Sequence, residues 1–419
     1  MSDLGFLEKL LDGVYLEWKP LGEVLVRTKG TKITAGQMRE LHKEEAPVKV
    51  FAGGKTVAFV DFGDIPEKDV NRKPSIIVKS RGVIEFEYYD QPFSHKNELW
   101  SYNASGKAIN IKYVYYFLKL NEPHFQGIGS KMQMPQIATP DTDKFEIPIP
   151  CADNPKKSLE IQAEIVRILD AFTELTAELT AELTAELTAR KKQYNYYRDQ
   201  LLRFEEGEVQ WKTLAEVIYS LKTGLNPRQN FQLNTPDAQG YYVTVREIQN
   251  GKVTFLEKTD RVNEKALKLI NGRSNLDAGD VLFSGTGTVG RTAVIEDKPE
   301  NWNIKEGVYV IKPVQEKILP RYLAHLLNSS ETVKDYSKKI VGNPVVSLSL
   351  GDLRKLKIPV PPLDKQARIV AILDKFDALT NSITEGLPRE IELRQKQYEY
   401  YRDLLLSFPK PETASAASA

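Results

Sequence analysis

The segment QAEIVRILDAFTELT at residues 162–176 returns as QARIVAILDKFDALT at residues 366–380, and this repetition determines how the chain is organised. The segment RKKQYNYYRDQLLRF at 190–204 returns in the same way as RQKQYEYYRDLLLSF at 394–408. Both pairs are separated by the same 204 positions, so the two copies have equal length. A direct repeat of this extent predicts two halves with a similar architecture.

Shorter matches extend the repeat toward the start of each half. EWKPLGEV at 17–24 resembles QWKTLAEV at 210–217, and FEIPIP at 145–150 resembles LKIPVP at 356–361. The residues between these ends differ between the two halves. Shared ends indicate a common scaffold, whereas divergent middles indicate that each half recognises something different.

The composition is that of a soluble multidomain protein. A chain of 419 residues with 41% apolar and 27% charged residues suggests two to four domains. No apolar run approaches the roughly 18–20 residues that span a bilayer, and the N-terminus lacks a secretory signal. Cys151 is the only cysteine, and the four histidines are scattered without partners at metal-ligand spacing. We therefore expect a cytoplasmic protein without a structural metal.

The net charge of +1 does not by itself indicate nucleic-acid binding. A dedicated nucleic-acid binder usually carries a basic surplus. Either this chain binds no nucleic acid, or its basic residues are local, or partner proteins supply the remaining positive charge.

The repeated segments predict two long amphipathic helices, because apolar residues recur every three or four positions. The I-P-x-P sequence before each helix favours an extended approach, since proline disfavours helical geometry in the residue before it. Two equal helices can bury their apolar faces against each other. We predict an antiparallel intramolecular coiled coil between two globular domains, in a pseudo-two-fold arrangement. The alternative is that each helix packs only on its own domain.

The first helix contains three T-A-E-L units at 176–187, whereas its counterpart at 381–392 contains Gly386 and Pro388. These two residues predict a kink or a local opening of the second helix. Each T-A-E-L unit lengthens a helix by about 6 Å and rotates the next part of the helix by about 40°. That rotation is close to the roughly 34–36° per base pair of DNA. The tract is either a ruler in DNA-sized steps or a solvated helix expanded by replication slippage, and both can be true.

Each helix closes with the sequence QYxYYRDxLL, which has two interpretations. The tyrosines either pack the helix end against the neighbouring domain or form a duplicated docking face, because aromatic residues and arginine are enriched at interface hot spots. A duplicated face implies two copies of one partner. The candidate partner-binding residues are Tyr194, Tyr197 and Arg198 in the first copy and Tyr398, Tyr401 and Arg402 in the second.

The divergent middles predict globular domains of mixed α and β structure with many short strands. Residues 109–120 and 318–330 have helical patterns among strand–turn–strand units. GTGTVG at 285–290 fits a dinucleotide-binding pattern, but the strand-forming RTAVIE that comes after it predicts a hairpin. GGKT at 53–56 lacks the first glycine of a phosphate-binding loop. Neither motif therefore predicts a nucleotide site.

Polar loops at matching places in the halves are the candidate DNA contacts. IIVKSRG at 76–82 aligns with VLFSGTG at 281–287, and the segments at 131–137 and 338–348 both precede an I-P-x-P sequence. Such side chains contact phosphates or base edges. The candidates are Lys79, Arg81, Lys131 and Gln133 in the first half and Arg246, Ser284, Thr286, Lys338, Lys339 and Asn343 in the second. No catalytic constellation stands out, which favours a recognition subunit.

Two variable domains, each followed by a helix ending in QYxYYRDxLL, with T-A-E-L units in the first helix, resemble the specificity subunit of a type I restriction-modification enzyme of the type IC group. The resemblance covers essentially the whole chain and is most specific at 145–204 and 356–408. It implies target recognition domains at 1–150 and 205–360, conserved helices at 151–204 and 361–408, and a flexible tail at 409–419.

The resemblance also implies the partners and the cellular context. Each recognition domain would read one half of a split double-stranded DNA target. The helices would set the gap between the half-sites and bind two modification (methyltransferase) subunits, which restriction subunits can join in a prokaryotic cytoplasm. S-adenosylmethionine, ATP and magnesium would be bound by those partners, and this chain would bind no cofactor and catalyse no reaction.

Two other function classes remain open at this point. One is a coiled-coil adaptor that does not touch DNA, and the other is an autonomous DNA-modifying enzyme. Salt-dependent DNA binding separates the first from a specificity subunit, because phosphate contacts impose a steep dependence of affinity on salt. Methylation by this chain alone would indicate the second.

Overall fold

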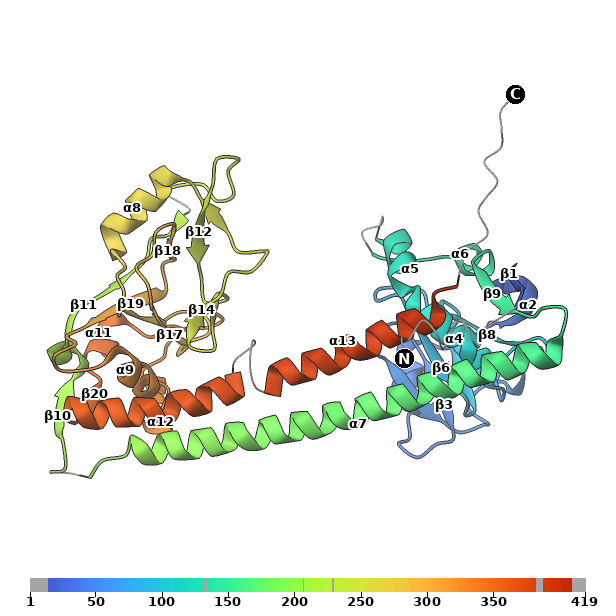
Figure 1. The fold of residues 1–419 in the computed structure, drawn as a ribbon, viewed down its shortest axis with the longest axis horizontal. Coiled ribbons are helices and arrows are strands. Elements are labelled where there is room, and N and C mark those ends of the chain that lie inside the picture. The colour runs from blue at the N-terminus through green and yellow to red at the C-terminus, as the bar shows by residue number, and fades with distance from the viewer. Residues whose placement is uncertain are drawn as a thin grey trace. The chain divides into compact units, whose positions relative to one another are not determined.

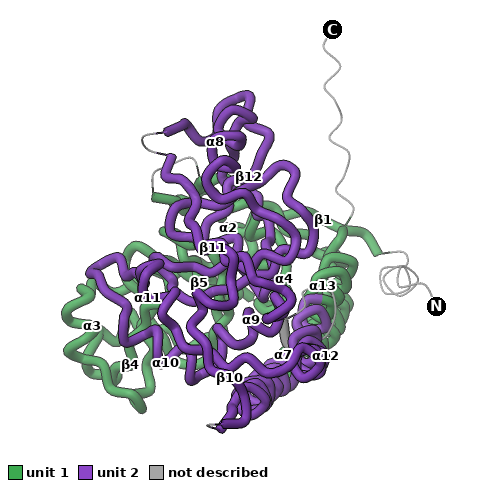
Figure 2. The backbone as a smooth tube through the Cα atoms, turned by 90° about the vertical axis from the view of Figure 1, so that its left-hand side faces the viewer, with its two compact units in different colours: residues 1–179, 393–419 green, residues 180–392 purple. Residues whose placement is uncertain are grey.

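The structure is a computed structural model of the chain (Figure 1). It describes residues 14–106, 108–130, 134–205, 207–227, 230–381 and 387–408. The chain divides into two compact units, one of residues 1–179 with 393–419 and the other of residues 180–392 (Figure 2). The last segment of the chain therefore belongs to the same unit as the N-terminal domain.

In its described residues, the first unit contains three sheets. A four-stranded antiparallel sheet has the order β2-β8-β5-β6, and a three-stranded sheet has the order β4-β3-β7, in which β3 and β7 are parallel. Strands β1 and β9 form a separate antiparallel pair that joins the entry of the domain to its exit. The strands are β1 (Leu16–Pro20), β2 (Leu25–Thr28), β3 (Val48–Phe51), β4 (Val57–Val60), β5 (Ser75–Lys79), β6 (Glu85–Tyr89), β7 (Phe93–His95), β8 (Trp100–Ala104) and β9 (Glu146–Pro150).

The largest apolar cluster of the first unit joins the four-stranded sheet to the helices, and smaller clusters lie around the three-stranded sheet. Fully buried Ile76 of the sheet, Tyr113 of α4, and Ile165 and Leu169 of α7 belong to one apolar cluster. The helices are α2 (Leu21–Val24), α3 (Ala35–Leu41), α4 (Ile111–Leu120), α5 (Glu122–Gly129), α6 (Thr139–Asp143), the beginning of α7 (Pro155–Leu201) and most of α13 (Leu387–Leu406), with the 3-10 turn η1 (Glu67–Asp69).

The second unit repeats these sheets strand for strand. The order β11-β19-β16-β17 matches the first four-stranded sheet, and β15-β12-β18 matches the three-stranded one, with β12 and β18 parallel. Strands β10 and β20 form the closing pair. The strands are β10 (Gln210–Thr213), β11 (Ile218–Thr223), β12 (Gly240–Val243), β13 (Ile248–Gln249), β14 (Lys252–Val253), β15 (Arg261–Val262), β16 (Val281–Ser284), β17 (Thr292–Val294), β18 (Trp302–Ile304), β19 (Val308–Pro313) and β20 (Lys357–Val360).

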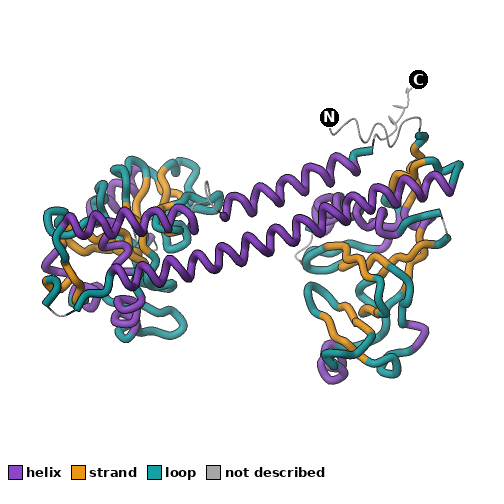
Figure 3. The backbone as a smooth tube through the Cα atoms, turned by 60° about the horizontal axis from the view of Figure 1, so that its bottom comes forward, coloured by secondary structure: helices purple, strands orange, loops and turns teal. Residues whose placement is uncertain are grey.

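The helices of the second unit include the end of α7 and one helix, α8, that comes after the short hairpin β13–β14. The others are α9 (Pro320–Leu327), α10 (Ser330–Ser337), α11 (Leu350–Arg354) and α12 (Leu363–Asn381), with α8 at Glu264–Ser274 and the 3-10 turn η2 at Leu214–Val217. Figure 3 shows that both domains mix short strands, loops and helices. The prediction of two mixed α and β domains is therefore confirmed, including the helices expected at 109–120 and 318–330.

Both glycine-rich motifs lie in hairpins, which the sequence predicted for GTGTVG only. GTGTVG connects the antiparallel strands β16 and β17, and GGKT lies between the antiparallel strands β3 and β4. Neither loop leads from a strand into a helix. Both segments therefore lack the strand–loop–helix arrangement that holds a dinucleotide or a triphosphate.

The first long helix, α7, is continuous over 47 residues, whereas the second is divided into α12 and α13. Pro388 is the second residue of α13, where a missing backbone N–H costs little. Gly386 and the rest of 382–386 lie outside the described residues. Among the described helices, none is both long enough and apolar enough to cross a membrane.

The two long helices pack antiparallel within each unit. In the first unit, Phe172 of α7 stacks on Tyr401 of α13, and earlier residues of α7 share a core cluster with Leu405 and Leu406. In the second unit, Phe376 of α12 stacks on Tyr197 of α7. Both stacks join the phenylalanine of one repeat copy to the same tyrosine position of the other copy. The prediction of antiparallel, pseudo-symmetric helices is therefore confirmed.

A buried glutamine at the start of each repeat joins the helix to its own domain. Gln162 accepts a hydrogen bond from the backbone N–H of Asn110 at 2.8 Å, where α4 begins. Gln366 accepts one from the N–H of Leu319 at 2.8 Å, where α9 begins. The Nε2 group of each glutamine donates to a carbonyl two residues before that amide. Each glutamine thus satisfies an amide at a helix start, a place that leaves such donors unpaired.

An aspartate eight residues later joins the same helices. Asp170 lies 2.8 Å from the ammonium of Lys112 and accepts a hydrogen bond from the hydroxyl of Tyr116 at 2.6 Å. Its repeat partner, Asp374, lies 2.7 Å from the guanidinium of Arg321 and 2.8 Å from the imidazole of His325. The repeated motif Q-A-x-I-V-x-I-L-D-x-F therefore contains the residues that attach each domain to its helix.

Candidate nucleic-acid interface

In the first unit, the turn after β5 is joined to the segment before α6 by backbone hydrogen bonds. The N–H of Gly82 donates to the carbonyl of Pro135 at 2.9 Å, and the N–H of Ile137 donates to the carbonyl of Ser80 at 3.0 Å. Gly82 has a φ of +76°, which other residues adopt only with strain. Backbone hydrogen bonds at residues 80–82 and 135–137 therefore join the two segments of the first half that carry candidate DNA contacts, and we call this pair of segments a double loop.

The second unit has the same construction. The N–H of Gly287 donates to the carbonyl of Val346 at 2.8 Å, and the N–H of Leu348 donates to the carbonyl of Gly285 at 2.9 Å. Gly287 has a φ of +79°, close to that of Gly82. The two domains thus present matching double loops although their sequences there differ.

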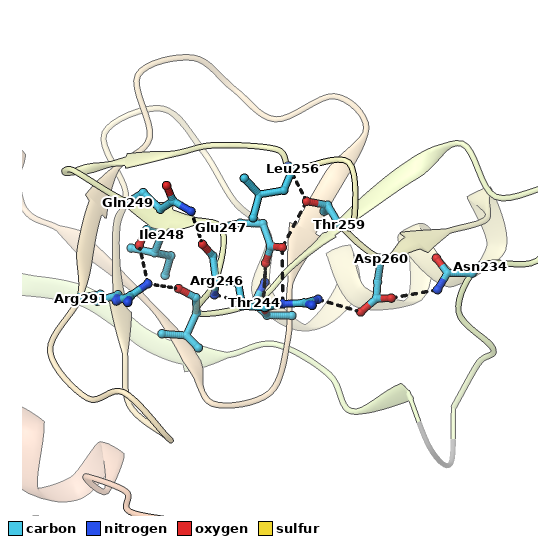
Figure 4. Close-up of polar contacts among 11 residues, drawn as sticks. Asn234, Thr244, Arg246, Glu247, Ile248, Gln249, Leu256, Thr259, Asp260 and Arg291 are labelled. Atoms are coloured by element: carbon cyan, nitrogen blue, oxygen red, sulfur yellow. Dashed lines mark hydrogen bonds and ion pairs between the residues drawn. The ribbon is translucent and has the colours of Figure 1, made fainter. Parts of the chain in front are cut away.

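The loop that carries Arg246 is held from within by a buried carboxylate (Figure 4). Glu247 is fully buried and accepts hydrogen bonds from the backbone N–H of Thr244 at 2.8 Å and from its hydroxyl at 2.6 Å. It also accepts a hydrogen bond from the hydroxyl of Thr259 at 3.2 Å. The loop therefore has one defined backbone path although it contains no long strand.

The side chain of Arg246 is about half exposed, at 52%, and its guanidinium lies 3.3 Å from Asp260. Asp260 in turn accepts a hydrogen bond from Asn234 at 2.9 Å. Arg291 donates to the carbonyls of Val245 and Ile248, which fixes the loop on its other side (Figure 4). Arg246 is thus oriented by a carboxylate while part of its donor fork faces solvent, which suits contact with a phosphate or a guanine edge.

One cavity of the second unit brings Arg246 together with the double loop. Its lining includes Thr286, Gly287 and Ser347 of the double loop, together with Arg246 and Lys305. Two of the predicted residues, Arg246 and Thr286, therefore line the same cavity. Lys305 was not predicted, because it becomes recognisable only when the strands of the two halves are superposed by their pairing.

In the first half, the predicted DNA-contact residues that the structure describes differ in exposure. Arg81 is exposed on the double loop. Lys79, by contrast, is only 5% exposed at the end of β5, where its ammonium lies 2.6 Å from Glu85 and 2.8 Å from Glu87. These ion pairs outweigh burial and raise the pKa of Lys79. The expectation that Lys79 lies on a loop is wrong, because Lys79 is the last residue of β5, while Lys131 and Gln133 lie outside the described residues.

In the second half, Ser284 is the residue that departs from expectation. It is fully buried at the end of β16, where its hydroxyl donates to the carbonyl of Thr288 at 2.6 Å and accepts from the N–H of Arg291 at 2.7 Å. These bonds help to close the hairpin, so the expectation that Ser284 lies on a loop is also wrong, because it is the last residue of β16. The remaining candidates on this half are the exposed Lys338 and Asn343 and the half-buried Lys339.

The predicted partner-binding residues of the first QYxYYRD segment take part in internal contacts. The hydroxyl of Tyr194 lies 3.1 Å from Nδ1 of His325, and burial raises the pKa of Tyr194 to about 12, so that the hydroxyl stays protonated. Arg198 is buried and donates to Asp199, which also accepts hydrogen bonds from Ser330. Tyr197, which stacks on Phe376, remains 41% exposed.

The second segment makes corresponding contacts. Tyr398 accepts a hydrogen bond from Thr173 at 3.1 Å, Tyr401 stacks on Phe172, and Arg402 donates to Asp403 at 2.6 Å. These contacts support the interpretation that the two segments pack the helix ends. They do not test whether the same segments bind a partner.

A tyrosine that was not among the predicted residues is the most exposed tyrosine of each segment. Tyr196 is 61% exposed and Tyr400 is 59% exposed, and they occupy the same position in the repeat. Each lies edge-on to the tyrosine next to it in the chain, with ring centroids 5.4 Å apart. The signal in the sequence was the repeated tyrosine pair itself.

Within the described residues, no group of three potential metal ligands is present.

Comparisons with known proteins agree with this architecture. A family model described as "Type I restriction modification DNA specificity domain" matches the chain twice, over residues 17–189 and 207–393. The chain is 40% identical over 423 residues to the "Type I restriction enzyme EcoR124I/EcoR124II specificity subunit" of Escherichia coli, which covers 99% of this chain and 100% of that protein. A putative type I restriction enzyme specificity subunit of Haemophilus influenzae is 33% identical, covering 96% and 98%.

A solved structure described as "Structural basis underlying complex assembly and conformational transition of the type I R-M system" has a similar fold. Its TM-score is 0.60 at 15% identity, covering 93% of this chain and 97% of that one. The likeness covers both domains and the long helices. Matched twice by one family model and over its whole length by curated relatives, this chain belongs to the DNA specificity subunits of type I restriction-modification systems, as a recognition subunit without catalysis of its own.

Proposed function

We propose that each half of this chain reads one half of a split double-stranded DNA target through its double loop. The observation that carries the proposal is the repeated construction of the two loops, in which two backbone hydrogen bonds join the same segments in both domains. A shared frame that carries different side chains suits two readers with different sequences. Base edges are read by side chains, while a common frame keeps the register on the duplex.

The residues that we assign to DNA contact are those that remain accessible. In the second half they are Arg246, Thr286, Lys338, Lys339 and Asn343, and in the first half Arg81, with Lys131 and Gln133 retained from the sequence. Arg246 is the strongest of these, because Asp260 orients its guanidinium without burying it. We assign the domains at 1–150 and 205–360 to recognition and the helical segments at 151–204 and 361–408 to spacing and assembly.

We infer that the two QYxYYRD segments each dock one modification subunit, which restriction subunits can then join. The exposed, repeated Tyr196 and Tyr400 support this inference, because exposed aromatic side chains are frequent anchors of protein interfaces. S-adenosylmethionine, ATP and magnesium would then be bound by the partners. Partner charges would also complement the net charge of +1 on this chain. An adaptor without DNA contact does not account for membership in a DNA specificity family.

The experiment that tests the proposal is to map methylated bases across a genome that expresses this chain with its modification subunits. We expect two unrelated half-sites at a fixed separation. Replacing residues 210–360 with the matching region of another specificity subunit should change one half-site and leave the other unchanged. A single continuous target, or a change in both half-sites, would contradict the assignment of one reader to each half.

A further inference from the structure

The ends of β7 and β18 occupy equivalent places in the two domains. Each strand lies parallel to its neighbour, with His95 of β7 and Ile304 of β18 at the last paired position. The next residue is a lysine in both cases, Lys96 in the first domain and Lys305 in the second.

The backbone around these lysines is the same in both domains. The N–H of Lys96 donates to the carbonyl of Phe51 at 2.9 Å, and the N–H of Lys305 donates to the carbonyl of Val243 at 2.8 Å. The carbonyl of each lysine accepts the amide three residues further on, at 3.0 and 3.1 Å. The two lysines are therefore structural equivalents, although they lie in the divergent part of the repeat.

A glycine from a neighbouring segment approaches each lysine. A Cβ atom on Gly30 would lie 2.2 Å from the carbonyl oxygen of His95, and one on Gly224 would lie 1.9 Å from that of Ile304. No side chain fits at such distances. These two glycines are therefore shared by the domains because the backbones come too close for any other residue.

The backbone geometry does not explain why both domains have a lysine at this position. The segments FSHKNELW at 93–100 and WNIKEGVY at 302–309 agree only in the lysine, and any residue except proline supplies the same N–H and C=O groups. The ammonium of Lys96 lies 2.7 Å from Glu98. Lys305 is exposed, and its side chain makes no hydrogen bond or ion pair with the part of the chain that the structure describes. No internal contact common to both lysines explains why both domains have one.

We propose that Lys96 and Lys305 each contact a DNA phosphate, so that the two readers share one contact that does not depend on sequence. This inference rests on the proposed function. Two domains that read different bases still meet the same sugar–phosphate backbone, and lysine contacts phosphate as a point charge. Lys305 lines the same cavity as Arg246 and Thr286, which places it beside the proposed base-reading residues. A phosphate can replace Glu98 at Lys96, because partly exposed ion pairs contribute little to stability.

The test compares Lys96→Gln, Lys305→Gln and the double variant, each assembled with modification subunits. Affinity is measured against salt concentration for a duplex that contains the mapped target and for a duplex of equal length without it. Each single variant should reduce the slope of log affinity against log salt by about 0.9 on both duplexes, and the double variant by about twice that. Lys305→Arg should keep the slope, and the exposed Lys144→Gln and Lys298→Gln serve as matched controls.

The methylated sequence should be unchanged in every variant. An unchanged slope, or a loss confined to the target duplex, would overturn the proposal, because the first excludes a phosphate contact and the second indicates base reading. Failure of the proposed function would look different, since the unaltered complex would then show neither target preference nor a split methylated site.

Discussion

The ring of Phe172 lies nearly parallel to the ring of Tyr401, with centroids 5.3 Å apart and 9° between the planes. The repeat partners Phe376 and Tyr197 stack at 5.5 Å and 24°. Stacked aromatic pairs contribute about 0.5–1.5 kcal/mol beyond the area they bury. We expect Phe172→Leu and Tyr401→Leu to be coupled by that amount in a double-mutant cycle.

Amide hydrogen exchange of residues 165–179 would measure this coupling. Tyr401→Phe should keep it, because the ring remains and only the hydroxyl is lost. Additive effects of Phe172→Leu and Tyr401→Leu would show that the stack contributes nothing beyond burial.

Asp374 predicts a pH-dependent contribution to stability. Burial raises its pKa, but the hydrogen bond from His325 and the charge of Arg321 lower it more, so the net shift is downward. Asp374→Asn should cost about 1–3 kcal/mol near pH 7, because a partly buried pair loses its charge. A depressed folded-state pKa stabilises the fold above the unfolded value of about 3.9 and stops doing so as the pH falls through the folded value.

Thermal unfolding would measure this contribution. The midpoint temperature of Asp374→Asn should lie well below that of the parent chain at pH 7 and closer to it at pH 3. Asp364→Asn is the matched control, because Asp364 is 67% exposed and makes only a 3.7 Å pair within α12. An equal difference at both pH values would contradict the electrostatic origin.

The T-A-E-L tract predicts a change in spacer length. Deleting residues 180–183 removes about 6 Å of α7 and rotates its end by about 40°. The target should lose one base pair between its half-sites while both half-sites stay the same, as methylome sequencing would report. Glu182→Gln, which keeps the length, should leave the spacer unchanged. An altered half-site or an unaltered spacer in the deletion would refute the ruler.

Arg246 predicts a local change of specificity. Arg246→Gln should relax one base position of one half-site, because a bidentate arginine contact discriminates by about 1–3 kcal/mol. Arg246→Lys should do the same, since it keeps the charge and loses the fork. Arg81→Gln should affect only the other half-site, and Arg273→Gln at the end of α8 should affect neither. If Arg246→Gln still methylated only the parent target, Arg246 would not be a base-reading residue.

Tyr196 and Tyr400 predict the stoichiometry of assembly. Tyr196→Ala and Tyr400→Ala should each weaken one docking event, with a hot-spot loss of about 2 kcal/mol or more. Light scattering of the purified complex would then show one modification subunit for each single variant and none for the double variant. The neighbouring Lys192→Ala and Lys396→Ala are controls for side-chain truncation. If the double variant still bound two modification subunits, the docking surface would not include Tyr196 and Tyr400.

Helix periodicity and the repeat were enough to predict the long helices, their antiparallel packing and the mixed domains. These features arise from local patterns of apolar residues, such as Ile165, Leu169 and Phe172 on one helix face. The kink or local opening expected at Gly386 and Pro388 stays a prediction, because residues 382–386 lie outside the described residues; Pro388 is the second residue of α13. The attachments made by Gln162 and Asp170 were not, because their partners are distant in sequence.

The candidate site was harder to predict than the fold. Lys79 lies directly opposite Glu85 in the β5–β6 register, and no local pattern reveals that pairing. Ser284 is buried because the hairpin closes over it, which depends on the path of the turn rather than on residue type. Lys96 and Lys305 became comparable only when strand pairing showed that they come directly after equivalent strands.

The glutamines at the start of each repeat have a consequence for how such chains diversify. Gln162 and Gln366 bind main-chain groups of their domains, an amide and a carbonyl that every sequence presents. A gene crossover inside the repeated coding segment would therefore join a foreign reader to a native helix without disturbing these bonds. Recombination can therefore exchange whole recognition domains between such chains. New specificities can arise in this way without stepwise changes in the scaffold.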